Sequence, residues 1–171
     1  LFRSYLKSHA YTAGLMHDLG MLLLVRLHPF SLEPMIAYAR MKKKPLREAE
    51  RKYLGLTTRE MGACYADASG LPAVYRDVIR WVETPELATE NRKLVAIVSL
   101  ARHVCLHNRI GCCGDLPTDA GAPIVKTSAW QVIQPELFPS FDLGKFEAQA
   151  HACCVELRDE LVGRRHVSTH R

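Results

Sequence analysis

The sequence has no long hydrophobic run. Its longest apolar stretches, such as residues 21–25, are far shorter than the roughly 20 apolar residues that a helix needs to cross a bilayer. The first residues also lack the pattern of a secretory signal peptide. Hydrophobic residues still make up 48% of the 171 positions, which is enough for one globular core. We therefore expect no membrane association, a cytoplasmic location, and a single domain over residues 1–171.

Repeated Cys-x-x-Cys motifs and phosphate-binding glycine-rich loops are absent as well. The segment 111–114 contains two glycines but lacks the lysine and the strand-loop-helix setting of such a loop. Adjacent cysteines bridge each other only with strain, and a chain that can build a core needs no disulfide framework. We therefore expect mostly free thiols. The six cysteines, which include two adjacent pairs, are Cys64, Cys105, Cys112, Cys113, Cys153 and Cys154.

Positive charge is in modest excess and gathers in two short clusters. There are 23 basic and 18 acidic residues, which gives a formal charge of +5, and basic residues concentrate at 42–44 and 164–166. A patch for nucleic acid or an anionic membrane is one interpretation, and it predicts binding that weakens steeply with salt. Short clusters of this kind usually form a solvated turn and a basic chain end. We therefore expect no nucleic-acid partner.

Apolar residues recur at helical spacing almost throughout, and convincing alternating strand patterns are absent. Helices are predicted over residues 11–27, 32–41 and 45–54, then after residue 57, after residue 72, and over 89–108. The start signals are Ser31 as an N-cap, Pro45 at a first helical position, a capping box of Thr57 with Glu60, and Thr84 before Pro85. The prediction is an all-α fold, a compact bundle of roughly seven helices.

The composition changes in the last third of the chain. Residues 111–123 are rich in Gly, Pro, Asp and Thr and are predicted to form a loop. Residues 124–133 follow, and their pattern leaves a strand open as an alternative to a helix. A terminal helix is predicted over 141–163.

His17 and Asp18 are the most informative pair in the sequence. An adjacent imidazole and carboxylate can hold one or two divalent metals, provided that further His and Asp side chains arrive from other helices. The doublet alone binds little metal. Whether such partners exist therefore separates a metallohydrolase from a regulatory module.

The order of local motifs around this doublet resembles the HDOD family, the HD-related output domains of bacterial signalling proteins. Each motif is weak by itself, and the order and spacing of all of them carry the resemblance. The motifs lie at residues 13–22, 46–56, 60–63, 70–72, 78–85 and 94–101.

This resemblance implies a helical bundle of the HD-domain type. It implies a noncatalytic regulatory output domain in bacterial signal transduction, which acts by protein–protein interaction with another signalling protein or with a fused sensor or effector domain. Such domains have near two hundred residues, so the chain corresponds to the C-terminal portion, with earlier helices lacking.

The metal-ligand positions of the related HD hydrolases are mostly replaced. Thr58 stands where a His is usual, Val82 and Glu83 stand before Pro85 where a His-His pair is common, and Arg102 replaces the late Asp. His9 lies too close to the doublet to match the upstream ligand.

A binuclear hydrolytic site needs more ligands than remain. We therefore predict no catalytic residue, no metal and no cofactor, and His17 and Asp18 as a residual pair that orients the helix-loop junction. The alternative is a degenerate metal-dependent phosphohydrolase of nucleotides or cyclic dinucleotides, which uses His17 and Asp18 with Glu83 or with upstream ligands.

A second constellation offers a weaker metal site. His103 and His107 are four residues apart on one predicted helix, and Cys112 and Cys113 follow closely. Imidazole and thiolate ligands at this spacing suit a transition metal. The competing interpretation is an exposed helix end with cysteines that simply pack.

Two tryptophans and one apolar face are candidates for protein contacts. Trp81 and Trp130 are potential interface anchors, because exposed aromatic side chains concentrate binding energy. Core packing is the competing interpretation, more strongly for Trp81. The apolar face of residues 1–27 would be uncovered without upstream helices, which would favour self-association as a homodimer.

Overall fold

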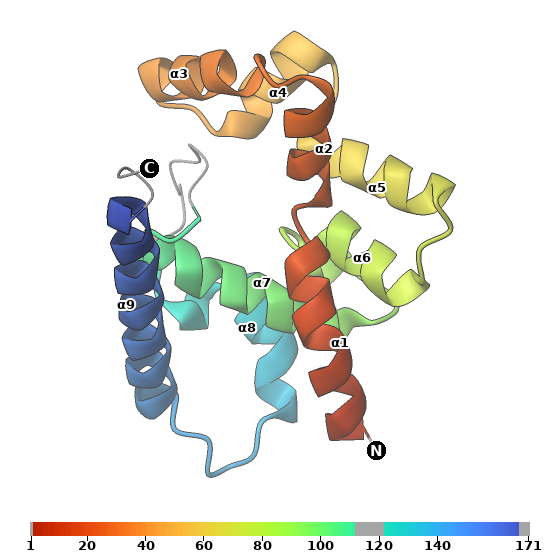
Figure 1. Ribbon diagram of the computed structural model, residues 1–171. Helices are drawn as coiled ribbons and strands as arrows, with labels where there is room; N and C mark the ends of the chain where they lie inside the picture. The colour runs from red at the N-terminus through yellow and green to blue at the C-terminus, as the bar shows by residue number, and fades with distance from the viewer. Residues whose placement is uncertain (1, 112–121, 168–171) are drawn as a thin grey trace.

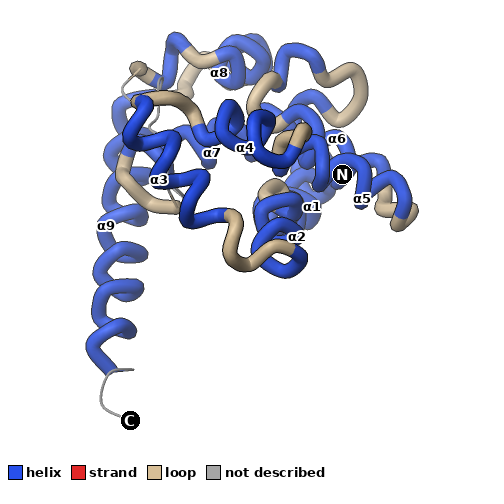
Figure 2. The backbone as a smooth tube through the Cα atoms, turned by 90° about the horizontal axis from the view of Figure 1, so that it is seen from above, coloured by secondary structure: helices blue, strands red, loops and turns tan. Residues whose placement is uncertain are grey.

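The computed structural model describes residues 2–111 and 122–167, and this part of the chain consists of helices and loops without strands (Figures 1 and 2). The predicted all-α fold is confirmed for these residues. The α-helices are α1 (Phe2–Met16), α2 (Leu19–Leu27), α3 (Leu32–Lys42), α4 (Leu46–Leu54), α5 (Thr58–Ala68), α6 (Ala73–Trp81), α7 (Arg92–His107), α8 (Ser128–Ile133) and α9 (Leu143–Val167). Short 3-10 helices are η1 (Pro85–Leu87), η2 (Ile124–Lys126) and η3 (Gln134–Glu136).

The predicted single helix over residues 11–27 is wrong, because the chain breaks at His17 and Asp18 between α1 and α2. The reason lies in the contact between α2 and α5. A Cβ atom on Gly20 would lie 1.7 Å from the carbonyl oxygen of Thr58, and one on Gly62 would lie 2.8 Å from the nitrogen of Gly20. Only two glycines allow backbones to approach this closely. Apolar periodicity does not register a break that such a tertiary contact imposes.

A predicted helix start is confirmed in detail where the side chain makes the expected capping hydrogen bond. Thr57 and Glu60 form the predicted capping box at the start of α5, with the nitrogen of Thr57 donating to Oε2 of Glu60 at 2.8 Å. Ser31 precedes α3 as predicted, but its side chain makes no capping hydrogen bond. Pro45 sits just before α4 instead of at its first position. The signal at Thr84 opens only η1, so α7 begins later than predicted.

The strand alternative for residues 124–133 is wrong, because this segment forms η2 and α8. The terminal helix predicted over 141–163 is present as α9, which extends to Val167. Most of the predicted loop 111–123 lies outside the described residues.

Three hydrophobic cores hold the described residues together, and α7 belongs to two of them. Leu94, Val95 and Val98 of α7 pack with α1 and α6 in the first core, whereas Ala96 and Leu100 pack with α8 and the start of α9 in the third. The second core lies among α2, α3 and α4. Burial of each large apolar side chain contributes about 1.5–3 kcal/mol. Helix α7 therefore links the N-terminal helices to the C-terminal ones.

Membrane-spanning potential is low in the described helices. None of them is by itself long and apolar enough to cross a membrane. The segments Ser8–Leu27 and Leu32–Lys42 satisfy the length and composition criteria only as a pair that is bent by 117°.

Candidate functional site

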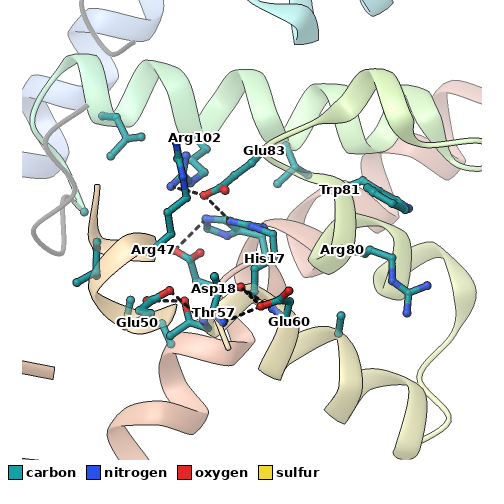
Figure 3. A pocket seen from close by; sticks show the side chains of 18 of the residues that line it. His17, Asp18, Arg47, Glu50, Thr57, Glu60, Arg80, Trp81, Glu83 and Arg102 are labelled. Carbon is teal, nitrogen blue, oxygen red and sulfur yellow. Dashed lines mark hydrogen bonds and ion pairs between the residues drawn. The ribbon is translucent and has the colours of Figure 1, made fainter. Parts of the chain in front are cut away.

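A cleft of about 850 Å³ opens where the α1–α2 turn faces α4, α5, α6 and α7. Its wall brings together residues that are far apart in the sequence (Figure 3). A cleft of this volume accommodates a small-molecule ligand. The ionisable side chains along it, apart from two cysteines, are His17, Asp18, Arg47, Glu50, Arg51, Arg59, Glu60, Arg80, Glu83 and Arg102.

The doublet lies at one wall of this cleft, and its polar atoms are engaged locally. Nδ1 of His17 donates to the carbonyl oxygen of Gly14 at 2.6 Å, and Nε2 lies 3.2 Å from Oδ2 of Asp18. The Asp18 side chain is 54% exposed. Burial raises its pKa, but the hydrogen bond and charge of His17, with the charges of Arg102 and Arg59, outweigh this effect and hold the pKa below its usual value. Asp18 is therefore a carboxylate at neutral pH.

Thr58 occupies the position where the resemblance predicts a histidine, and a buried carboxylate holds it. The nitrogen of Thr58 donates to Oε2 of Glu50 at 3.0 Å, and its Oγ1 donates to Oε1 at 2.8 Å. Glu50 is 2% exposed, although it lies on a helix whose other buried residues are apolar. Both residues line the cleft, and Glu50 accepts from the first backbone nitrogen of α5.

Glu83 faces two arginines from two other segments of the wall. Its Oε1 lies 2.8 Å from a terminal nitrogen of Arg59 on α5 and 3.3 Å from one of Arg102 on α7. Arg59 also donates to the carbonyl oxygen of Ile79 at 3.2 Å. Burial raises the pKa of Glu83, but the charge and hydrogen bond of Arg59, followed by the charges of Arg102 and Arg47, outweigh it, so the pKa is below its usual value.

These groups do not fit the metal centre of HD hydrolases. Glu83 is the carboxylate that could serve as a further metal ligand, yet the guanidinium groups of Arg59 and Arg102 neutralise it. Arginine stays protonated and therefore cannot itself coordinate a metal ion. A divalent ion at the doublet would also face the positive charges of Arg59 and Arg102. Among the described side chains, no group of three or more His, Cys, Asp and Glu residues is arranged to hold a metal ion.

The family model described as the HDOD domain matches residues 3–85. Residues 3–85 belong to the HDOD family. The matched HDOD segment contains the doublet, Thr58 and Glu83, and it ends before Arg102, which α7 supplies from outside the match. No curated protein and no solved structure matches the chain.

The alternative metal constellation is only partly visible, because Cys112 and Cys113 lie outside the described residues. The rings of His103 and His107 stack with their centroids 6.5 Å apart, and Nε2 of His103 lies 3.0 Å from the carbonyl oxygen of Ala122. Both histidines line a second cleft of about 250 Å³ with His151 of α9. At least His103 is therefore engaged with a backbone acceptor.

The two candidate tryptophans lie in different environments. Trp81 lines the large cleft and packs on the first core. Trp130 is 7% exposed and belongs to the third core, so it does not present a surface anchor. The ring of Trp130 contacts the ring of Phe141, and Phe146 packs on the same core.

His9 lies outside the cleft wall. Its Nδ1 is 3.0 Å from the hydroxyl of Tyr75, so it joins α1 to α6.

The apolar face predicted over residues 1–27 is open to solvent in its described part. Tyr11 and Leu15 of α1 are 75% and 63% exposed, and Leu22 and Leu27 of α2 are each 62% exposed. Phe30, in the turn that follows, is 90% exposed. Exposed apolar side chains in this number mark a candidate protein contact surface.

Two contacts at the cleft escape sequence reasoning. The hydrogen bond from Thr58 to Glu50 joins α5 to α4, and the contacts of Glu83 with its two arginines join the turn after α6 to α5 and α7. A signal for the first existed: Glu50 follows Ala49 on the apolar face of its helix, and a carboxylate there needs a buried partner. The second has no local signal.

Proposed function

We propose that this HDOD protein is a noncatalytic regulatory domain of bacterial signal transduction that works in the cytoplasm by protein–protein interaction. The observation that carries this proposal is the placement of Arg59 and Arg102 on Glu83 beside the His-Asp doublet. A metal-dependent hydrolase needs open ligands around the ion to generate hydroxide. Here the nearest carboxylate is already paired with cations.

The contacts of the doublet support a structural role for it. His17 closes the last turn of α1 through the carbonyl oxygen of Gly14. The carbonyl oxygen of Asp18 accepts from the nitrogens of Met21 at 2.9 Å and Leu22 at 3.3 Å, at the start of α2. Both residues thus stabilise the turn that lets Gly20 reach α5.

The exposed apolar face of α1 and α2 supports an interaction role. It is separate from the cores, and its residues would lose contact with water on binding a partner, at roughly 25 cal/mol per Å² of apolar surface. The partner on this proposal is another signalling protein, a fused sensor or effector domain, or a second copy of the chain. Since α7 joins two cores, we treat residues 1–171 as one domain.

A degenerate metal-dependent phosphohydrolase of nucleotides or cyclic dinucleotides is the second candidate. The doublet favours it, because it lines a cleft of about 850 Å³ whose lining also includes Glu83. This candidate requires a metal ion held by His17 and Asp18.

Metal analysis separates the two functions. The purified chain and its His17→Ala/Asp18→Ala variant are loaded with Mn²⁺ or Zn²⁺, desalted without chelator, and analysed for bound metal. We expect equal, substoichiometric metal in both. Near-stoichiometric metal that disappears in the variant, together with hydrolysis of a phosphodiester, would overturn the noncatalytic proposal. An Asp18→Asn variant controls for loss of the turn.

Self-association tests the homodimer version of the interaction role. Sedimentation velocity over a range of concentrations compares the wild type with Leu15→Lys and Leu22→Lys. If a homodimer forms through this face, both changes shift the protein to the monomer. Leu157→Lys serves as the matched control, since Leu157 is 51% exposed on α9, away from the face.

A further inference from the structure

Helix α9 crosses the C-terminal end of α7 (Figure 1). At this crossing, Nδ1 of His151 on α9 lies 2.6 Å from Oδ1 of Asn108 on α7. One turn earlier on α7 is Cys105, and one turn later on α9 is Cys154. Side chains three residues apart lie on the same face of a helix, so each cysteine lies on the helix face that carries this contact.

The two cysteines are free thiols, and the interaction with Cys154 is one of the causes that raise the pKa of Cys105. Their environments differ. Cys154 is 5% exposed, whereas Cys105 lines the wall of the large cleft. A small solute in that cleft therefore reaches Cys105 first, because Cys154 is buried and does not line the cleft. Cys153, next to Cys154 in the sequence, is exposed to solvent.

We propose that Cys105 and Cys154 form an oxidative modification site, at which a peroxide converts the two thiols into a disulfide that fixes α9 on α7. This inference is independent of the regulatory function proposed above. It assigns a chemical role to residues that the cleft and the HDOD match leave unexplained.

The chemistry balances with hydrogen peroxide as the oxidant. The Cys105 thiolate attacks one peroxide oxygen, the O–O bond breaks, and a sulfenic acid and one water form. The Cys154 sulfur then attacks the sulfenic sulfur, the S–S bond of about 2.0 Å forms, and a second water leaves. Two electrons pass from the two thiols to the peroxide, and their protons end in water.

The surroundings of Cys105 predict a slow reaction at neutral pH. Burial raises its pKa, and the contact with Cys154 raises it further, so the reactive thiolate is scarce. The rate of disulfide formation should therefore increase with pH from 7 to 9. The site would respond to sustained oxidation and not to brief exposure.

The test uses the full chain treated with hydrogen peroxide, followed by alkylation of free thiols and mass mapping of peptides under non-reducing conditions. We expect one linked pair that joins the Cys105 peptide to the Cys154 peptide and is released by dithiothreitol. The linked protein should also resist proteolysis within α9. This measurement on the wild type does not depend on how any variant folds.

Variants then assign the bond. Cys105→Ala and Cys154→Ala should each abolish the link, while Cys153→Ala and Cys64→Ala should retain it. A version that keeps only Cys105 and Cys154 should still form it. Preferential pairing of Cys105 with another cysteine, overoxidation without a link, or both thiols remaining free after hours at pH 9 would each overturn the proposal.

Discussion

Two parts of the lining of the large cleft, which we call the glycine wall and the ionic wall, are held by different kinds of contact. On the glycine wall, α2 and α5 touch through the backbones of Gly20 and Gly62. On the ionic wall, Glu83, in the turn after α6, and Arg102 of α7 meet through side-chain ions. Backbone contact leaves almost no freedom for substitution, whereas an ion pair depends on a few exchangeable side chains. The architecture of the cleft and its chemistry are therefore separable.

On the proposed noncatalytic role, this difference accounts for a His-Asp doublet without the usual metal-ligand partners. His17 and Asp18 stabilise the turn that the glycine contact requires, so their positions serve the fold. Glu83 and Arg102 lie outside the glycine contact, so a change of their side chains leaves that contact intact. The cleft of about 850 Å³ therefore carries guanidinium groups beside the doublet.

The largest expected effect is on the glycine wall. Gly20→Ala forces a Cβ atom to within 1.7 Å of the Thr58 carbonyl oxygen, so α2 and α5 must separate. We expect a loss of about 3 kcal/mol in the free energy of unfolding, measured by urea denaturation. Gly14→Ala is the matched control, because its Cβ atom meets nothing within 4 Å, and it should stabilise α1 by about 0.5–1 kcal/mol. Equal effects at the two glycines would contradict the backbone contact.

The ionic wall should respond less. Glu83→Gln removes the charge shared by Arg59 and Arg102, and we expect a loss of about 1–2 kcal/mol at pH 7, reduced by the partial exposure of all three side chains. Glu48→Gln, in an exposed pair with Lys44, should change stability far less.

The pH dependence of this difference follows from the lowered pKa of Glu83. Its contribution is fully present above the unfolded pKa of glutamate, about 4.3, and is lost as the pH falls through the lower folded pKa. The difference in the free energy of unfolding between wild type and Glu83→Gln, measured by urea denaturation at each pH, should therefore shrink below about pH 4. A gap that stays constant down to pH 2 would mean that the ion pairs contribute nothing.

The smallest expected effect is at the helix caps. Thr57→Ala removes the side chain that accepts from the nitrogen of Glu60 at 3.2 Å, which should cost about 1 kcal/mol. Ser31→Ala should stay within about 0.5 kcal/mol, since Ser31 makes no capping bond. Thermal or urea unfolding of both variants distinguishes these outcomes. A larger loss at Ser31 would reverse this ranking.

Sequence reasoning succeeded where the determining contact is local. The Thr57–Glu60 box spans four residues and was predictable, as were the helical class and the HDOD resemblance. It failed at the α1–α2 break, because the cause is a contact between Gly20 and residues of α5 far along the chain. Likewise, the replaced ligand positions were visible as Thr58 and Arg102. The contacts of Arg59 and Arg102 with Glu83 were not visible in the sequence, because these residues come together only in the folded chain.

The most direct test of the central claim is a Mn²⁺ titration by calorimetry of the wild type beside a Thr58→His/Arg102→Asp variant, after circular dichroism has shown that the variant is folded. The variant removes one guanidinium from the cleft and adds two metal-binding side chains. We predict no saturable Mn²⁺ binding by the wild type and measurable binding by the variant. Saturable, near-stoichiometric binding by the wild type, lost in His17→Ala/Asp18→Ala, would contradict the account.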